Sequence, residues 1–390
     1  MNPASPRKNS VFAIYIVSFV LTLHISLLAY IYSSFLSKFA GEKVVGLIFS
    51  AGSLFTALAF IKFPATLRRL GNYKLFLILL AVDLLALLGL AVSNALLLAA
   101  SLFVVHFVVS ALVGLNLDIF LENYSTDRKT GRIRGLFLTI VNSAWVMGPL
   151  IAGFVLSNGD YWKIFVASAI LILPVLVLTK GNLAHFKDPD YREFAPIKTA
   201  ARVWKNKNLY RIFMANFLLQ FFYALMVIYT PLYLHEHVGL SWSAIGMVFA
   251  VMLTPFVILQ LPLGRLADIA YGEKEILSIG FLIMAVTTGL ITFITSQSLL
   301  VWAAILFATR VGASMTEVMV EVYFFKQITE RNVGTMSLFR LMRPAAYLVA
   351  PAIASAVFII FGLPITSIFA VLALVMFYGL RYSLAIKDTL

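Results

Sequence analysis

The sequence contains no cysteine among its 390 residues, and only 12% of the residues are charged. Without cysteine there can be no disulfide scaffold of the kind that stabilises small secreted proteins. Soluble globular chains carry about 25% charged residues, so this chain has too few charges to cover itself in water. Disorder and coiled coils are excluded as well, because both require many more polar residues.

Apolar residues are abundant instead, making up 62% of the chain and occurring in long runs. A helix needs about 20 mostly apolar residues to cross a bilayer. The chain contains twelve runs of about this kind, at residues 11–36, 44–61, 75–92, 95–122, 135–156, 164–178, 210–234, 244–263, 276–294, 299–325, 336–361 and 363–380. The sequence therefore predicts an all-α polytopic membrane protein with twelve transmembrane helices.

The formal net charge of +13 would suit nucleic acid, but the distribution of Lys and Arg offers a better explanation. If the N-terminus lies inside, 24 of the 30 Lys and Arg residues fall in cytoplasmic segments, and only Lys38, Lys43 and Lys163 fall outside. Cytoplasmic loops of membrane proteins carry such an excess. We therefore expect an integral protein of the plasma (inner) membrane with both termini cytoplasmic and no nucleic-acid partner.

The one long hydrophilic stretch lies near the middle of the chain and predicts three parts. These are a six-helix half at residues 1–180, a cytoplasmic linker at 181–209 and a second six-helix half at 210–390. Within the linker, Pro196 can open a short helix with Ile197 and Trp204 on one face and basic residues on the other. Such a helix suits the inner leaflet, and an ordinary basic linker is the alternative.

The two expected halves share sequence features at an offset near 200 residues. Phe137 is followed twelve residues later by Pro149, and Phe339 is followed twelve residues later by Pro351. Acids spaced four apart also recur, as Asp118 with Glu122 and Glu317 with Glu321. Parallel repeats of six spans are the plan of one large transporter fold.

A loop motif carries the closest resemblance to a known family. Residues 264–268 read GRLAD, from Gly264 to Asp268, and are followed by GEK at 272–274. This resembles the signature loop of the major facilitator superfamily, with one extra residue before its second glycine. The resemblance implies that Asp268 approaches the N-terminus of the fifth span, where a carboxylate gains about 0.3–1 kcal/mol from the helix dipole.

The usual copy of this loop between spans two and three is degraded. Arg68 stands where the family has an acid, with Arg69 next to it, and Asp118 and Glu122 occupy the fourth span, where the family often has arginine. We expect a charge swap, with Arg68 or Arg69 facing one of these acids, because two acids in an apolar helix need partners. The alternative is that both arginines merely follow the excess of positive charge on the inside.

A second resemblance lies in the fifth span, where residues 148–153 read GPLIAG. This pattern is similar to a superfamily signature that is commoner in proton-driven exporters. Small residues at this spacing also let helices pack closely, whatever the direction of transport.

Polar side chains near the middle of the expected membrane predict where a solute binds. In the superfamily, spans one, four, seven and ten line the central cavity, with two, five, eight and eleven beside them. The polar residues at that depth are Ser26, Tyr30, Asn142, Trp145, Gln220, Tyr223, Arg310 and Tyr347. Arg310 is interpreted either as a ligand for an anionic group of the solute or as a partner of Glu317.

Further charged residues lie closer to the expected cytoplasmic side, where they suit a gate. A charge at bilayer depth costs about 2.5–3.5 kcal/mol on the insertion scale, so each needs a partner or a role. A salt-bridge gate is the preferred interpretation, and proton carriage by the acids is the alternative. The residues of this group are Arg68, Arg69, Asp118, Glu122, Gly264, Asp268, Glu317, Glu321, Arg340 and Arg343.

Other titratable residues fit neither group. His24 and His106 lie off the polar faces of their helices, so packing is the expected role of both. Asp83 lies in the middle of the third span and needs a hydrogen-bond partner, which the sequence does not identify. The sequence has no phosphate loop, catalytic triad signature or metal motif, so we expect no cofactor and no metal.

The sequence thus predicts a secondary transporter, not an enzyme, that works by alternating access. We expect it to function as a monomer and to move a small solute together with or against protons. Proton-coupled efflux of an amphiphilic or drug-like compound is the leading prediction, because the cavity helices combine aromatics with few charges. A proton-coupled importer or facilitator of a metabolite or organic anion is the alternative. A membrane-embedded enzyme using Asp118 and Glu122 is more remote, because the acids recur in both halves.

Overall fold

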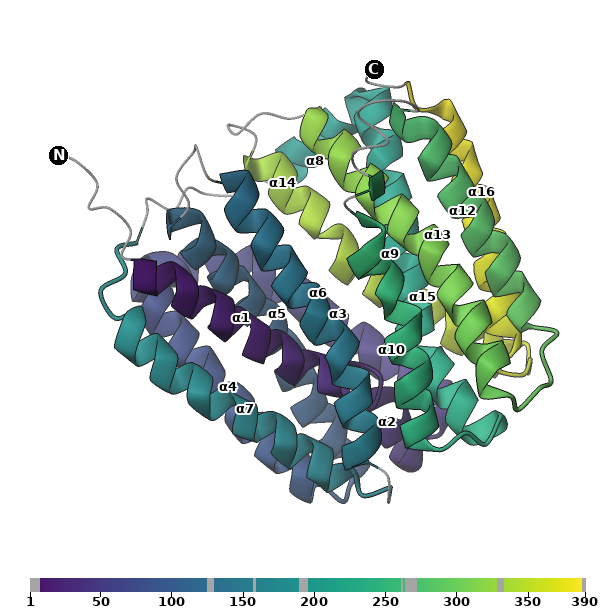
Figure 1. Ribbon diagram of the computed structural model, residues 1–390, viewed down its shortest axis with the longest axis horizontal. Helices are drawn as coiled ribbons and strands as arrows, with labels where there is room; N and C mark the ends of the chain where they lie inside the picture. Colours follow the sequence, from purple (N-terminus) through teal and green to yellow (C-terminus); the bar gives the residue numbers. More distant parts are fainter. Residues whose placement is uncertain are drawn as a thin grey trace.

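The described part of the chain is helical throughout, and the predicted fold class is confirmed. A computed structural model (Figure 1) describes residues 8–124, 130–156, 159–188, 196–260, 262–263, 272–327 and 333–387. Its helices are α1 (Lys8–Ala29), α2 (Tyr32–Ala40), α3 (Glu42–Leu70), α4 (Asn72–Val92), α5 (Leu96–Tyr124), α6 (Thr130–Val155), α7 (Tyr161–Asn182), α8 (Pro196–Lys205), α9 (Lys207–Leu232), the π-helix η1 (Tyr233–His237), α10 (Trp242–Ile258), α12 (Gly272–Ile291), α13 (Leu299–Lys326), α14 (Val333–Arg340), α15 (Met342–Ile360) and α16 (Ser367–Ala385).

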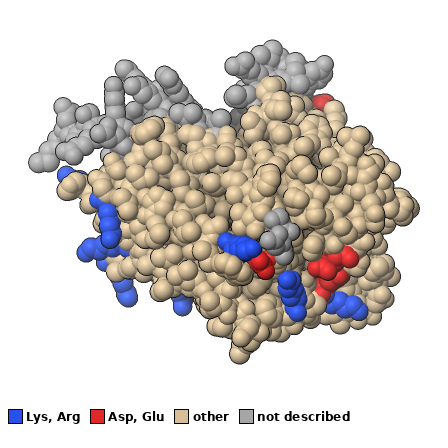
Figure 2. Space-filling model, turned by 60° about the horizontal axis from the view of Figure 1, so that its bottom comes forward, with Lys and Arg blue, Asp and Glu red and all other residues tan. Residues whose placement is uncertain are grey.

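The apolar runs of the sequence correspond to these helices. Within the described residues, 10 helices are long and apolar enough to cross a membrane. The shorter apolar helices Ile140–Val155 and Trp242–Ile258 match the fifth and eighth runs, completing the twelve that the sequence predicts. The described part of the face seen in Figure 2 is mostly uncharged, with Lys, Arg, Asp and Glu in small separate groups. A surface of this kind is expected for a protein surrounded by lipid.

Two pairs of helices make most of the contact between the first half of the bundle and the second, and α2 also touches α9. One seam is formed by α6 on α10, and the other by α3 on α15. At the first seam Gly246 lies against the carbonyl oxygen of Pro149, and at the second Gly46 lies against that of Pro351. Each glycine leaves room for a backbone carbonyl where a Cβ would collide, so the two seams use equivalent contacts. This arrangement is what a two-fold relation between the halves produces.

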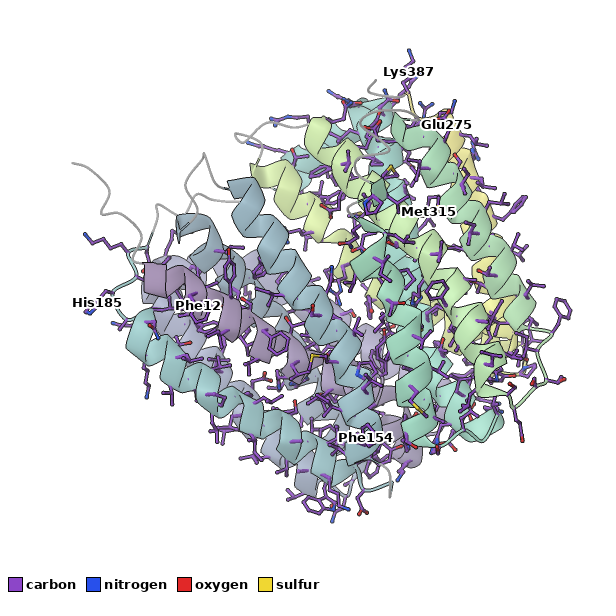
Figure 3. All side chains as sticks on the ribbon, in the orientation of Figure 1. Phe12, Phe154, His185, Glu275, Met315 and Lys387 are labelled. Carbon is purple, nitrogen blue, oxygen red and sulfur yellow. The ribbon has the colours of Figure 1, made fainter. Side chains whose placement is uncertain are left out.

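The seams run toward the end of the bundle that the sequence places outside. Phe154 lies at that end, and Glu275 and Lys387 lie at the opposite end (Figure 3). At the Phe154 end His237 also meets Glu42 across the halves, with 2.8 Å between His Nε2 and Glu Oε1. Contacts between the halves therefore hold the expected outer end closed.

The first expected span is broken in its last third, toward the expected outer end, rather than continuous. Its helix α1 ends at Ala29, the chain turns at Tyr30 and Ile31, and α2 starts at Tyr32. Both tyrosines are buried. The break turns one tyrosine toward the second half and the other toward the interior of the first half, as described below.

The expected linker helix is present as α8. Thr199 and Val203 are buried, and α8 contacts α9 and α14. On the other face Ile197 is 85% exposed and Trp204 is 72% exposed. Contact of this face with the inner leaflet stays a prediction.

Candidate functional site

Three helices of the second half and the break in the first span bring a group of charged and aromatic side chains together. The hydroxyl of Tyr223, on α9, donates a hydrogen bond of 2.8 Å to Glu317 Oε2, on α13. Arg310, two turns before Glu317 on the same helix, is only 1% exposed. Tyr30 from the break interacts with the Arg310 guanidinium, so the group spans both halves.

The Arg310 guanidinium is buried among aromatic rings and is incompletely hydrogen-bonded. Its Cζ lies 5.1 Å from the ring centre of Phe222 and 5.9 Å from that of Tyr223. Its Nη1 has no hydrogen-bond partner in the described part of the protein. Arg310 interacts electrostatically with Glu317, yet no nitrogen–oxygen distance of 4.0 Å or less joins the two described side chains. The geometry therefore leaves one donor of Arg310 available to another group.

A second arginine approaches the same acid from α15. The Arg343 guanidinium Cζ lies 5.7 Å from the ring centre of Tyr347 and interacts with Glu317. The ring of Tyr347 in turn lies 6.2 Å from that of Phe107, on α5 of the first half. Arg343 is exposed, whereas Tyr347 is buried. We call Tyr30, Tyr223, Arg310, Glu317, Arg343 and Tyr347 the central cluster.

The central cluster carries more positive than negative charge. Arg310 and Arg343 face one acid, Glu317, so its formal charge is positive while Glu317 is ionised. Of the two arginines only Arg310 is buried, and an unpaired buried charge is costly in a membrane protein. A single negative charge from a bound solute would bring this cluster to neutrality.

The other residues expected at this depth, among them Asn142 and Ser26, mainly make hydrogen bonds and packing contacts between or within helices. Asn142 Nδ2 donates to Gln260 Oε1 over 3.2 Å and so joins α6 to the segment that follows α10, while Gln220 makes a long contact of 3.4 Å with Asn216. Trp145 is half-buried and packs on the apolar core. The Ser26 hydroxyl lies 3.0 Å from the carbonyl oxygens of both Leu23 and Ala144.

A small cavity lies beside the break, between the halves. Ser26 and Tyr30 line it from the first span, Pro149 and Gly153 from α6, and Trp242 and Phe249 from α10. The ring of Tyr30 lies 4.7 Å from that of Phe249, centre to centre. The cavity is therefore narrow and mostly apolar, and the polar cluster around Arg310 lies on the other side of Tyr30.

Several expected gate residues lie outside the described part of the chain. This applies to Gly264 and Asp268 altogether, and to the side chains of Asp118 and Glu122. Arg68 and Arg69 are exposed in the last turn of α3, and Glu321 and Arg340 are exposed on α13 and α14. The charge swap and the contact of Asp268 with the fifth span stay predictions.

A polar group that the sequence did not reveal lies inside the first half. Asp83, on α4, accepts a hydrogen bond of 3.1 Å from His24 Nε2 on α1 and one of 2.6 Å from His106 Nδ1 on α5. The expectation that both histidines only pack is wrong. Each lies off the polar face of its own helix because that face points to the other half, whereas Asp83 lies within the first half. Only their shared depth near mid-membrane could have signalled the contact.

Comparisons with known proteins agree with this architecture. The model of the Major Facilitator Superfamily matches residues 14–254 and 212–385. A mutant of the nucleoside transporter NupG is 12% identical, with 96% of this chain and 99% of that chain covered and a TM-score of 0.77. Another structure of NupG is 11% identical, with 97% and 100% covered and a TM-score of 0.76.

A further similar structure is a bacterial homolog of the human lysosomal transporter Spinster, inward-facing and unoccupied. It is 11% identical, with 98% of this chain and 95% of that chain covered and a TM-score of 0.70. A comparison with the curated proteins finds no match. At these identities the solved structures share the fold, and the family model spans nearly the whole chain. The chain therefore belongs to the major facilitator superfamily and is a membrane transporter, not an enzyme.

Proposed function

We propose that the chain is a proton-coupled symporter that takes up a small organic anion, the importer that the sequence leaves as an alternative. The observation that carries this proposal is the unpartnered Nη1 of the buried Arg310. An arginine donor presents a planar fork that suits carboxylate and phosphate oxygens. Donors of this kind aimed between the two halves are suited to an anionic group of a solute.

The aromatic residues around Arg310 suggest the rest of the solute. The rings of Phe222 and Tyr223 face the guanidinium, and Tyr30 and Phe249 close the side toward the small cavity. Ligand sites that combine a few polar groups with aromatic walls accept compact solutes with an apolar body. An aromatic or otherwise amphiphilic monoanion meets both conditions.

The charges of the central cluster explain how a proton would accompany the anion. A proton on Glu317 would leave two arginines without a counter-charge, and this is unfavourable unless an anion is also bound. An anion bound at Arg310 competes with Glu317 for positive charge and so favours protonation of that acid. The two ligands therefore help each other to bind, and such mutual coupling is reciprocal. Co-transport in one direction is the consequence, and an inward proton gradient drives uptake.

Transport into proteoliposomes tests the proposal with three probes of different charge: salicylate, uridine and ethidium. An inside-alkaline pH gradient should drive accumulation of salicylate well above the passive uptake of this weak acid by protein-free vesicles, and should drive accumulation of neither other probe. Arg310→Gln should reduce salicylate uptake about 10- to 150-fold, since hydrogen bonds to charged groups contribute about 1.5–3 kcal/mol. Arg381→Gln, which changes an exposed arginine of α16, is the matched control and should keep full uptake. Unchanged salicylate uptake by Arg310→Gln would contradict the proposal.

Export of an amphiphilic or drug-like compound is the second candidate, supported by the GPLIAG pattern of α6. In the structure its glycines serve close packing, since Gly148 lies against Ser26 and Gly153 against Trp242. An exporter should exchange ethidium for protons in the opposite direction. Ethidium accumulation driven by an inside-acidic gradient, together with no salicylate uptake, would favour this candidate.

The topology and the oligomeric state belong to the same proposal. The Lys and Arg distribution supports cytoplasmic termini in the plasma (inner) membrane. We also propose that transport is carried out by a monomer, whose two six-helix halves are joined by the 181–209 linker. Uptake should therefore be unaffected when the monomer is diluted to one copy per vesicle.

A further inference from the structure

Away from the central cluster, a buried carboxylate lies between two imidazoles in the first half. We call His24, Asp83 and His106 the His–Asp–His cluster. Their side chains are 1%, 1% and 3% exposed, respectively. They come from α1, α4 and α5, so their hydrogen bonds tie three helices together.

The outer nitrogen of each imidazole faces a serine hydroxyl, which can either donate or accept. Ser168 Oγ, on α7, lies 2.6 Å from His24 Nδ1 and 3.0 Å from the His24 carbonyl oxygen. The Ser168 carbonyl oxygen lies 3.2 Å from the same Nδ1. When Nδ1 lacks a proton, the hydroxyl donates to it. When Nδ1 is protonated, it donates to Ser168 and the hydroxyl turns to the His24 carbonyl.

His106 has the same freedom, since its Nε2 lies 3.2 Å from Ser110 Oγ. A hydroxyl rotates to suit its partner and serves as donor or acceptor. Both imidazoles are thus hydrogen-bonded in the neutral state and in the protonated state. The hydrogen bonds of the cluster therefore allow either state.

The charge of the cluster indicates which state is preferred. The other titratable group that interacts with Asp83 among the described residues is Tyr32 on α2, whose ring centre lies 5.3 Å from that of His106. No described Lys or Arg pairs with Asp83, and α7 contributes only the uncharged Ser168. With both imidazoles neutral, the cluster holds an uncompensated carboxylate at membrane depth, which is costly. One added proton turns it into an ion pair of zero net charge.

The close contacts also distinguish a proton from a metal ion. Zinc bound by nitrogen and oxygen ligands lies about 2.0–2.2 Å from each, so its ligands stand farther apart than a hydrogen bond. His106 Nδ1 and Asp83 Oδ1 are 2.6 Å apart, the separation of a direct hydrogen bond. The described geometry therefore fits a shared proton.

The broken first span connects this cluster with the central cluster. Tyr32 begins α2 and packs on His106, whereas Tyr30, two residues earlier, faces Arg310. Only Ile31 separates the two tyrosines, so a change in the packing of Tyr32 would act on Tyr30 through a single intervening residue.

We propose that the His–Asp–His cluster binds one proton, shared between Asp83 and its two imidazoles, and that this proton is coupled through the break at Tyr30 and Ile31 to solute binding at Arg310. Its role in transport rests on the proposed symport, whereas its binding of a proton does not. The site lies outside the solute pathway, so it holds a proton that the solute never touches.

Histidine NMR tests the proton site directly. Replacing His185, His235 and His237 with Gln leaves a full-length chain whose only imidazoles are those of His24 and His106. After ¹⁵N-histidine labelling in nanodiscs, its spectrum at pH 7.5 should show one imidazolium per chain, shared between the two rings. Two neutral imidazoles at that pH would overturn the proposal, and this measurement needs no variant at the cluster itself.

The same spectrum of an Asp83→Asn variant should lose the imidazolium, because the negative charge that holds the proton is gone. Asp160→Asn, at an exposed acid paired with Lys163, is the matched control and should keep it. An imidazolium retained in Asp83→Asn would overturn the proposal. One zinc per chain in elemental analysis of the purified protein would do so as well.

Salicylate transport tests the coupling. Asp83→Asn should lose gradient-driven accumulation at least tenfold while keeping salicylate exchange between equal pools, which needs no net proton movement. Full accumulation by this variant would overturn the coupling. If the wild-type protein does not transport salicylate, the proposed symport of anions fails, and the histidine spectrum still decides whether the cluster binds a proton.

Discussion

Replacing Gly46 with alanine should shift the protein away from the conformation that is closed at the outer end. A Cβ at this position would collide with the Tyr229 hydroxyl and would lie 2.5 Å from the carbonyl oxygen of Pro351 and 2.5 Å from Ser355 Oγ, well inside the 3.4 Å at which ordinary contact begins. The serine hydroxyl can rotate away, but the carbonyl belongs to the backbone of α15. The helices α3 and α15 must therefore separate at this seam.

The expected magnitude follows from the cost of overpacking a close contact, about 1–3 kcal/mol. Since every 1.4 kcal/mol is a tenfold change, the ratio of outer-closed to outer-open molecules should fall about 5- to 150-fold. Gly246→Ala should act in the same direction at the other seam, where the carbonyl of Pro149 takes the place of that of Pro351.

Electron–electron distance measurements provide the assay. The chain has no cysteine, so spin labels at Lys43→Cys and Glu236→Cys, on opposite halves at the outer end, report without background. Gly46→Ala should add or enlarge a population at longer distance. Gly114→Ala is the matched control, because nothing lies within 4 Å of its Cβ. A Gly46→Ala distribution identical to that of the wild type would refute the reasoning.

Three further predictions concern other parts of the chain. Glu317→Gln should abolish accumulation driven by a pH gradient but retain salicylate exchange; loss of both in a folded variant would speak against its role as proton carrier. Trp204→Glu should weaken contact of α8 with the membrane, seen as tenfold or greater loss of surface labelling of α8 by a lipid-bound photoprobe; unchanged labelling would place this face in water. Arg68→Asp and Glu122→Arg should each lose most uptake and together restore at least a third of it, and failure of the double variant would exclude their pairing.

Much of the fold follows from the length of the apolar runs, because a bilayer fixes how long a spanning helix must be. The sequence could not predict the break between Ala29 and Tyr32, which contains neither proline nor glycine. Its cause is tertiary, since buried tyrosines on both sides of it pack against different halves. Local sequence patterns do not show which residues contact each other between distant helices.

Only those contacts of the central cluster that lie within one helix were predictable from the sequence. Arg310 and Glu317 share one face of a single helix, so spacing alone places them together. The contact of His24 with Asp83 joins α1 to α4, and spacing within one helix says nothing about a partner on another. Polar residues that face a neighbour inside one half therefore look like isolated exceptions in the sequence.

The two glycine seams have a consequence for how the cycle is controlled. Among the described residues, their close contacts involve no Asp, Glu, His, Lys or Arg side chain: Gly46 meets the Tyr229 hydroxyl, the Pro351 carbonyl and the Ser355 hydroxyl, and Gly246 meets the Pro149 carbonyl. The contribution of the two seams to the outer closure is therefore nearly constant throughout the cycle. A proton or a solute must then select between conformations by acting at the charged groups instead. Its binding free energy has to exceed the constant free energy with which the seams favour the outer-closed conformation.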